Sequence, residues 1–270
     1  MNATVLTNGI ALLHLLGMFA AVHAVTHART PQGAIGWVLG LLLLPYVTLL
    51  PYLYLGSSRF LGYHAGHPAP TPQPLPEAPA MDTVGPAHAR FAAISALQRR
   101  PFRSGHRLQL LVDGKAAFDE MFAAMAAARQ CLLVQFFVIR DDLLGRRLQQ
   151  VLLQRAAAGV QVCVLFDGVG SYALPRHYVA TLRAGGVAIH RFATHRWRNR
   201  FQLNFRNHRK ILVIDGERGF VGGLNVGDEY MGRKPPLAPW RDTMLELRGP
   251  AVGDLQKLFA DDWQWITGQL

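Results

Sequence analysis

The sequence predicts an α/β domain, with a mixed sheet flanked by helices, preceded by a two-helix transmembrane hairpin. Three observations support this prediction. Two apolar stretches open the chain of 270 residues, a proline-rich stretch follows, and beyond residue 100 short apolar runs alternate with segments of helical spacing. Such alternation is typical of a sheet covered by helices on both faces. We therefore divide the chain into residues 1–60, 61–100 and 101–270.

Residues 1–60 have the composition of a membrane anchor. Their apolar stretches cover about residues 5–25 and 33–55, each close to the ~20 residues that a helix needs to cross a bilayer core. Pro45 and Pro51 interrupt the second stretch, but transmembrane helices tolerate proline. A secretory signal peptide is the alternative for the first stretch, although no positively charged side chain precedes Asn8.

A hairpin of two spans has both ends on one side of the membrane. We therefore expect a multi-pass protein of the inner cell membrane, with the following domain on the side of the N-terminus. The sequence leaves open which face that is, because Arg29 between the spans and Arg59 after them nearly cancel in the positive-inside count.

Residues 61–100 are expected to connect the anchor to the domain. The run PAPTPQPLPEAPA at residues 68–80 favours extended polyproline II, as in a semi-rigid spacer. A short helix is expected from Phe91 to Arg100.

The domain of residues 101–270 carries the alternating pattern. Apolar runs predict strands at 108–112, 131–139, 160–166 and 187–192, and helical spacing predicts helices at 116–129, 144–158 and 179–184. Cys131 and Cys163 lie inside two of the apolar runs, so we expect buried free thiols.

The charge of the chain indicates an anionic partner. The formal net charge is +11 and the pI about 10.3, which suits phospholipid head groups, nucleic acid or a phosphorylated metabolite. Between Asp167 and Asp215 no acidic residue occurs, whereas this interval contains Arg176, Arg183, Arg191, Arg196, Arg198, Arg200, Arg206, Arg209 and Lys210. The interval is either a positive funnel towards a site or a patch for anionic lipid.

Aromatic side chains interleave with these arginines. Trp197, Phe201 and Phe205 fit shallow insertion at a lipid interface or stacking on bases.

The segment Asn207 to Asn225 carries the candidate chemistry. His208 and Lys210 are two residues apart, so on a strand they point to the same face. Lysine can hold the non-bridging oxygens of a phosphate while histidine acts as nucleophile or acid. Asp215 opens a turn, and the glycines before Asn225 allow backbone N–H groups to approach a phosphate closely.

The full spacing resembles the motif of the phospholipase D superfamily: His-x-Lys, four residues, Asp, six residues, Gly-Gly-x-Asn. Further segments narrow the resemblance to bacterial cardiolipin synthases. These segments are QFFVIRDD at 135–142, FDGVGS at 166–171, PWRDT at 239–243 and GPAV at 249–252.

This resemblance implies a phospholipase D-like sheet and a specific reaction. Two phosphatidylglycerol molecules would give cardiolipin and glycerol, with neither metal nor nucleotide as cofactor. His208 would form a phosphohistidine intermediate, Lys210 and Asn225 would bind the phosphate, and Asp215 would steady the local structure. Asp242 would orient the nucleophilic histidine.

The chain departs from the family in carrying one motif, because enzymes of this type usually bring together two. It is either the N-terminal part of a longer protein, a homodimer in which two copies of His208 meet, or an inactive remnant that binds anionic lipid. A membrane-tethered phosphodiesterase or nuclease acting as a dimer is the alternative enzyme. We expect phosphatidylglycerol and the membrane, rather than nucleic acid, as partners.

Overall fold

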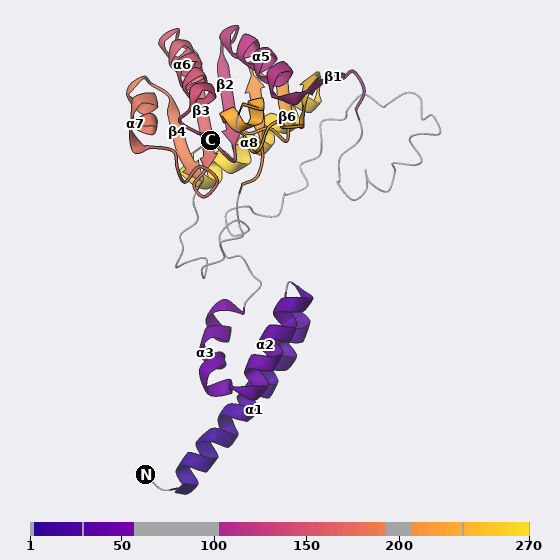
Figure 1. The fold of residues 1–270 in the computed structure, drawn as a ribbon, viewed down its shortest axis with the longest axis vertical. Coiled ribbons are helices and arrows are strands. Elements are labelled where there is room, and N and C mark those ends of the chain that lie inside the picture. The colour runs from indigo at the N-terminus through magenta and orange to yellow at the C-terminus, as the bar shows by residue number, and fades with distance from the viewer. Residues whose placement is uncertain (1–2, 29, 57–102, 193–206, 234, 270) are drawn as a thin grey trace, which may run out of the picture. The chain divides into compact units, whose positions relative to one another are not determined.

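The computed structural model describes residues 3–28, 30–56, 103–192, 207–233 and 235–269 (Figure 1). The chain divides into two compact units, a helical one at the N-terminus and an α/β one that contains residues 206–270. The predicted spacer and helix of residues 61–100, and the basic and aromatic residues from 196 to 206, lie outside the described residues.

The N-terminal unit contains three helices, α1 (Ala3–His27), α2 (Pro31–Leu43) and α3 (Pro45–Leu55). With 25 residues, α1 is long and apolar enough to cross a membrane. Residues 33–55, predicted as a second spanning helix, are divided between α2 and α3, so the second span stays a prediction. The chain leaves helical geometry at Leu44, with φ −136° and ψ 56°, because Pro45 has no N–H to continue the helical ladder. With 13 and 11 residues, neither α2 nor α3 reaches the ~17 residues of a short span.

The break at Leu44 reverses the direction of the chain. The α3 residue Tyr46 lies 6.2 Å from His14, between ring centroids, and the Tyr52 hydroxyl lies 2.6 Å from Nδ1 of His23. Residue numbers rise in the same direction in both pairs, so α3 runs parallel to α1. The end of α3 therefore lies level with the end of α1, whereas the second helix of a two-span hairpin would end level with the beginning of α1 (Figure 1).

Close packing holds this reversal against α1. A Cβ atom on Gly17 would clash with the carbonyl oxygen of Leu41 and lie 2.9 Å from Cβ of Pro45, so glycine permits the backbones to approach. The Thr48 hydroxyl donates to the carbonyl oxygens of Gly40 and Leu44, both at 2.8 Å. These contacts tie the start of α3 to the end of α2 across the break.

The α/β unit is built on a seven-stranded mixed sheet with the order β1-β7-β6-β5-β2-β3-β4. The strands β2, β3 and β4, at one side of the sheet, run parallel, and all other neighbours are antiparallel. The strands are β1 (Arg107–Val112), β2 (Cys131–Phe136), β3 (Gln161–Asp167), β4 (Ala188–Phe192), β5 (Ile211–Ile214), β6 (Arg218–Gly222) and β7 (Thr243–Arg248).

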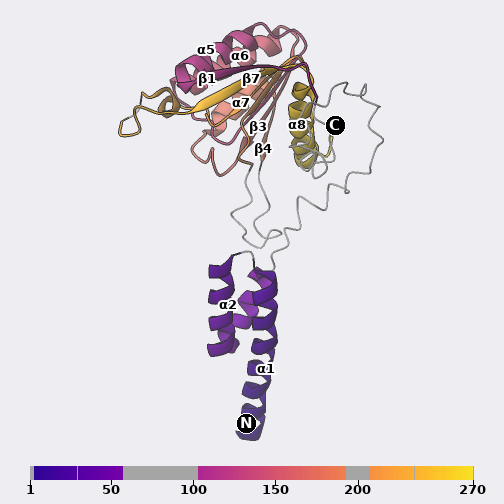
Figure 2. The ribbon, with the colours of Figure 1, turned by 90° about the vertical axis from the view of Figure 1, so that its right-hand side faces the viewer.

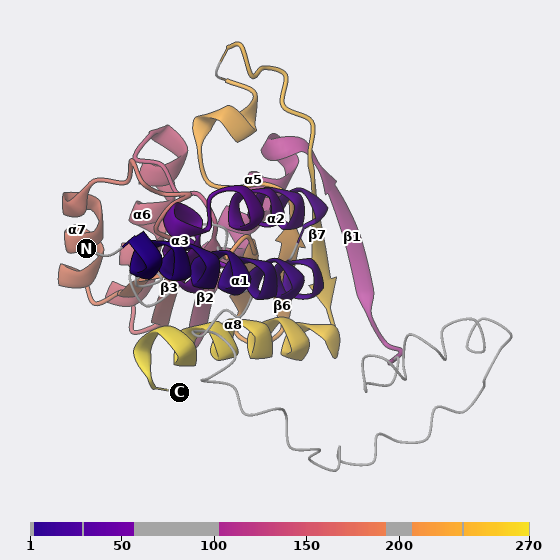
Figure 3. The ribbon, with the colours of Figure 1, turned by 90° about the horizontal axis from the view of Figure 1, so that it is seen from below.

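Helices cover both faces of the sheet, as predicted. On one face lie α5 (Asp113–Ala126), α6 (Leu143–Ala157) and α7 (Arg176–Ala184), which bury the main core with the strands. The other face is covered by α8 (Ala251–Thr267), as Figures 2 and 3 show. A 3-10 turn, η1 (Asp228–Met231), follows β6. Cys163 is buried and Cys131 half-buried, and both thiols are free.

Candidate active site

The ends of several strands meet at one edge of the sheet. The parallel strands β2 and β3 end there, at Phe136 and Asp167, and the antiparallel strand β5 begins there because Ile211 pairs with Gln135. His208 lies just before β5. The topology thus brings the predicted histidine to the carboxyl edge of the parallel strands, where ligands commonly bind in α/β sheets.

His208 and Lys210 lie side by side at this edge. Lys210 Nζ is 2.9 Å from Nδ1 and 3.2 Å from Nε2 of His208, and it donates to the His208 carbonyl oxygen at 2.8 Å. Phe137 packs on both, with its ring centroid 4.5 Å from that of His208 and 5.4 Å from Nζ. Lys210 is only 4 % exposed, whereas His208 is exposed. A reactive imidazole is therefore accessible beside a buried cation.

The surroundings lower the pKa of both side chains. Partial desolvation of the His208 ring, which Phe137 covers on one side, lowers its pKa below the usual 6.5, and the charge of Lys210 lowers it further; Asp167 opposes this. Burial lowers the pKa of Lys210 from 10.5 to about 8, against the pull of Asp242. The imidazole is then uncharged and the lysine mainly protonated near pH 7.

Two buried carboxylates hold the strand that carries His208. Asp262 of α8, 0 % exposed, accepts hydrogen bonds from the side chains of Asn207, Gln135 and Arg209. Asp167 accepts the backbone N–H of Asn207 at 3.0 Å. Because Asn207 and Arg209 flank His208, these bonds fix the backbone on both sides of the imidazole.

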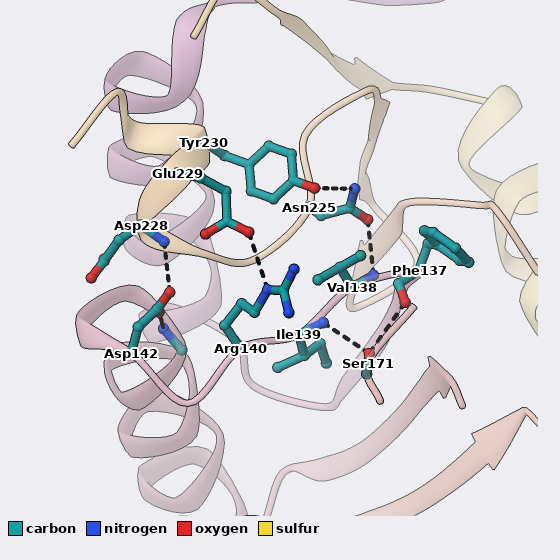
Figure 4. A network of polar contacts seen from close by, with 11 residues as sticks. Phe137, Val138, Ile139, Arg140, Asp142, Ser171, Asn225, Asp228, Glu229 and Tyr230 are labelled. Carbon is teal, nitrogen blue, oxygen red and sulfur yellow. Dashed lines mark hydrogen bonds and ion pairs between the residues drawn. The ribbon is translucent and has the colours of Figure 1, made fainter. Parts of the chain in front are cut away.

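Asn225 is buried and both ends of its amide are engaged. Its Oδ1 accepts the Val138 N–H at 3.0 Å, and its Nδ2 donates to the Tyr230 hydroxyl at 3.0 Å (Figure 4). The side chain thus joins the loop after β2 to the loop after β6. These bonds do not test its predicted phosphate-binding role, which stays a prediction.

The same two loops are also joined by an ion pair and by a backbone N–H group that donates to a carboxylate. Arg140 Nε lies 3.1 Å from Glu229 Oε1, and Asp142 accepts the Asp228 N–H at 2.7 Å (Figure 4). Asp228 in turn accepts the N–H of Leu144 at 3.1 Å, at the start of α6. These bonds tie together the loops beside the site and the start of α6.

Asp215 lies at the opposite end of the sheet, and the structure does not bring it to His208. Its backbone N–H bonds the Cys131 carbonyl at the start of β2. Its carboxylate accepts three backbone N–H groups, from Arg129, Gln130 and Cys131, at 2.9, 2.7 and 2.9 Å. These bonds hold the pKa of Asp215 below its usual value despite the opposing effect of burial. The steadying role fits this position, whereas a place among the catalytic groups does not.

The Asp242 carboxylate accepts hydrogen bonds from residues other than His208. Its carboxylate accepts the Thr243 N–H at 2.7 Å and the Trp240 Nε1–H at 3.3 Å, and its charge acts on Lys210. The hydrogen bond to His208 that the orienting role requires is not among those of the described residues. That role stays a prediction.

Sequence reasoning missed Phe137, Asp167 and Asp262 as parts of the site. Phe137 and Asp167 lie in segments that carried the family resemblance, and Asp262 lies in the run Asp261-Asp262-Trp263 of a helix. The available signal for Asp262 was its helical spacing with Val252, Leu255 and Phe259, which puts an acidic side chain on an apolar face. Within the described ranges, no group of three or more His, Cys, Asp or Glu side chains could hold a metal ion.

Comparison with known proteins identifies the family. The family model for the phospholipase D-like domain of cardiolipin synthase matches residues 121–263. Cardiolipin synthase A of Pseudomonas aeruginosa strain LESB58 is 52 % identical over 270 residues, covering 96 % of this chain and 55 % of the relative. The enzyme of Pseudomonas putida strain GB-1 is 50 % identical over 273 residues, covering 97 % and 57 %. The chain spans about half the length of the curated relatives it matches. It belongs to the phospholipase D-like family of bacterial cardiolipin synthases.

Proposed function

We propose that the chain forms the first catalytic half of a phosphatidyltransferase that makes cardiolipin and glycerol from two phosphatidylglycerol molecules. The observation that carries this proposal is the pair His208–Lys210, an accessible imidazole in contact with a buried ammonium. Membership of the cardiolipin synthase family supports the choice of substrate.

The proposed reaction has two displacements at phosphorus. A ring nitrogen of uncharged His208 attacks the first phosphatidylglycerol, the bond from phosphorus to the glycerol oxygen breaks, and glycerol leaves after taking a proton. A hydroxyl of the second phosphatidylglycerol then attacks the phosphohistidine, loses its proton, and frees the imidazole. Lys210 stabilises the charge on the non-bridging oxygens in both steps.

The leaving oxygen needs a proton donor besides His208. We propose that a second histidine supplies it, from the remainder of a longer chain or from a second copy of this one. Phe137 and Lys210 occupy one side of the His208 ring, which leaves the exposed side for substrate and donor.

The membrane arrangement we propose differs from a simple hairpin. In this arrangement α1 crosses the bilayer once, while α2 and α3 form a re-entrant pair against it, so the α/β unit lies on the side opposite the N-terminus. The length of α1 and the parallel course of α3 along it support this. Exposed apolar side chains on α1, such as Leu12 at 57 % and Phe19 at 69 %, suit contact with lipid.

A reporter experiment tests the arrangement. Alkaline phosphatase, which is active only outside the cytoplasm, and a fluorescent protein that matures only inside are fused in turn to each terminus. We expect the two termini to report opposite sides. The same side for both would contradict the re-entrant arrangement.

The catalytic proposal is tested with labelled phosphatidylglycerol in vesicles that contain the purified chain. We expect a labelled phosphoenzyme in the wild type and none in His208→Ala. His177→Ala serves as the matched control, since it removes another exposed imidazole, which pairs with Asp141, and leaves His208 in place. Cardiolipin should appear when a second histidine is available, either at chain concentrations that favour dimers or after addition of the remaining half of a relative. Labelling that persists in His208→Ala would rule out this nucleophile.

A further inference from the structure

A basic pocket lies on the α/β unit outside the contacts of His208. It has a volume of about 340 Å³ and lies between α7 and the ends of β3 and β4. Three arginines line it, Arg176 and Arg183 from α7 and Arg191 from β4. Its remaining lining is Phe166, Gly168, Ser171, Tyr172, Leu174, Val179 and Ala180, which combines apolar walls with two hydroxyls.

The arginines of this pocket have no ion-pair partner among the described residues, and Arg183 makes one bond to the Ile189 carbonyl at 3.1 Å. Two carboxylates close to these residues in sequence have other partners: Asp141 pairs with Arg146 at 2.9 Å and His177 at 3.4 Å, and Asp167 accepts the backbone N–H groups of Val169, Gly170 and Asn207. An accumulation of positive charge without acidic partners attracts an anion with several oxygens, such as a phosphate.

Arg191 packs closely against the backbone of Gly168 at the pocket. A Cβ atom on Gly168 would lie 2.8 Å from Cδ of Arg191. Any larger residue at 168 would therefore push the guanidinium from its position. Glycine here keeps the side chain of Arg191 across the pocket.

One layer of residues separates the pocket from the reaction centre. The loop that lines it packs on Phe137: Ser171 Oγ donates to the Phe137 carbonyl at 3.2 Å, and a Cβ on Gly170 would lie 2.9 Å from Cε2 of the Phe137 ring. The other side of Phe137 contacts His208. Figure 4 shows Ser171 next to the Phe137 carbonyl. The pocket and the imidazole are thus neighbours at one sheet edge.

The rim of the pocket favours a lipid over a soluble phosphate. Tyr172 is 79 % and Val169 45 % exposed on the loop beside it. Large side chains of this kind on an exposed loop, next to cations, are typical of a surface that meets the head-group region of a bilayer.

We propose that this arginine pocket binds the phosphate of an anionic phospholipid, with glycerol and the first acyl carbons on its apolar wall. This inference rests on the proposed function, because it adds a second lipid-binding position beside the phosphatidylglycerol that reacts with His208. A lipid held there would present its head group at the edge that carries His208.

The test measures lipid binding without turnover. The full chain carrying His208→Ala is kept in uncharged detergent and titrated with dihexanoyl phosphatidylglycerol, with dihexanoyl phosphatidylcholine and with inorganic phosphate. The pocket variant carries Arg176→Gln, Arg183→Gln and Arg191→Gln. The control removes three charges that do not line the pocket, through Arg107→Gln, Lys115→Gln and Arg155→Gln. Because catalysis is switched off, failure of the proposed reaction would not alter this result.

We expect the pocket variant to bind phosphatidylglycerol roughly tenfold or more weakly, since charge-assisted hydrogen bonds to phosphate are lost. The control should keep affinity within about threefold, the effect of distant surface charge. Equal affinity in both variants would overturn the proposal. Displacement of the lipid by inorganic phosphate at equal concentration would also overturn it, because the apolar wall would then contribute nothing.

A second variant covers the case in which the triple replacement does not fold. Ala180→Phe fills the apolar wall and keeps all three arginines. It should weaken phosphatidylglycerol binding several-fold and leave the weak binding of inorganic phosphate unchanged. Unaltered lipid binding in a folded Ala180→Phe variant would refute a lipid position here.

Discussion

Replacing Asp215 by asparagine should destabilise the α/β unit while leaving the reaction centre intact. The residue has a φ of 53°, a left-handed conformation that asparagine adopts nearly as readily as aspartate. The substitution therefore removes the charge without changing the turn.

The size of the effect follows from the three N–H groups that the carboxylate accepts. Two of them, from Gln130 and Cys131, bond one oxygen, Oδ1, and the third, from Arg129, bonds Oδ2. An asparagine oxygen could keep the first two as weaker neutral bonds, while its NH2 group would face the donor of Arg129. The loss is about 2 kcal/mol, or roughly 4–8 °C in Tm for a domain of this size.

Thermal unfolding followed by tryptophan fluorescence measures this, with Glu217→Gln, an exposed acid of the same turn, as the control. The pH dependence supplies a second criterion. Because the pKa of Asp215 is lowered in the folded state, its stabilisation is complete above the unfolded pKa of about 3.9 and is lost as the pH falls through the folded value. The gap in Tm between wild type and Asp215→Asn should therefore close in acid. An unchanged Tm with lost phosphoenzyme formation would show that Asp215 acts in the chemistry, and would refute this reasoning.

Three further predictions concern the site and the anchor. The rate of phosphoenzyme formation should rise with pH through the lowered pKa of His208 and fall above about pH 8 as Lys210 loses its proton. Lys210→Arg should move the fall in rate to higher pH, and a fall that stays in place would assign it to another group. Asp262→Asn removes the buried carboxylate that pairs with Arg209. We therefore expect a Tm lower by several degrees and, at temperatures well below the Tm, a rate of phosphoenzyme formation at least tenfold lower. A normal rate would mean that α8 does not position His208. Gly17→Val should detach α2 from α1 and lower the Tm in detergent, whereas Gly9→Val, which meets no atom within 4 Å, should not; equal effects would contradict the close packing at Gly17.

Several strands and helices of the α/β unit could be predicted from local pattern, whereas no element was predicted at residues 243–248 and 251–267, which form β7 and α8. The run 160–166 was expected as a buried strand, and β3 covers Gln161–Asp167 with six of its seven residues buried. The helix expected at 144–158 is α6 at Leu143–Ala157. His208 and Lys210 were placed correctly beside each other because a period of two defines one face of extended chain.

The features that local spacing did not place depend on partners distant in sequence. Local spacing put Asp215 in the motif, but seven residues of extended chain, roughly 23 Å, carry it to the other end of the sheet. Apolar content predicted a second span, but the single break before Pro45 redirected α3. The buried partners of Asp262 lie 53 to 127 residues away, so no window of sequence could pair them.

The anchoring of the histidine strand by α8 has a consequence for biogenesis. The bond between Gln135 and Asp262 spans 127 residues, and closing so long a loop must wait until α8 has been made. Synthesis at about 5–20 residues per second takes roughly 3 to 11 seconds to pass from His208 to Asp262. Through that interval the backbone beside His208 lacks the bonds that Asp262 supplies. The order of translation therefore delays reactivity until the domain has closed.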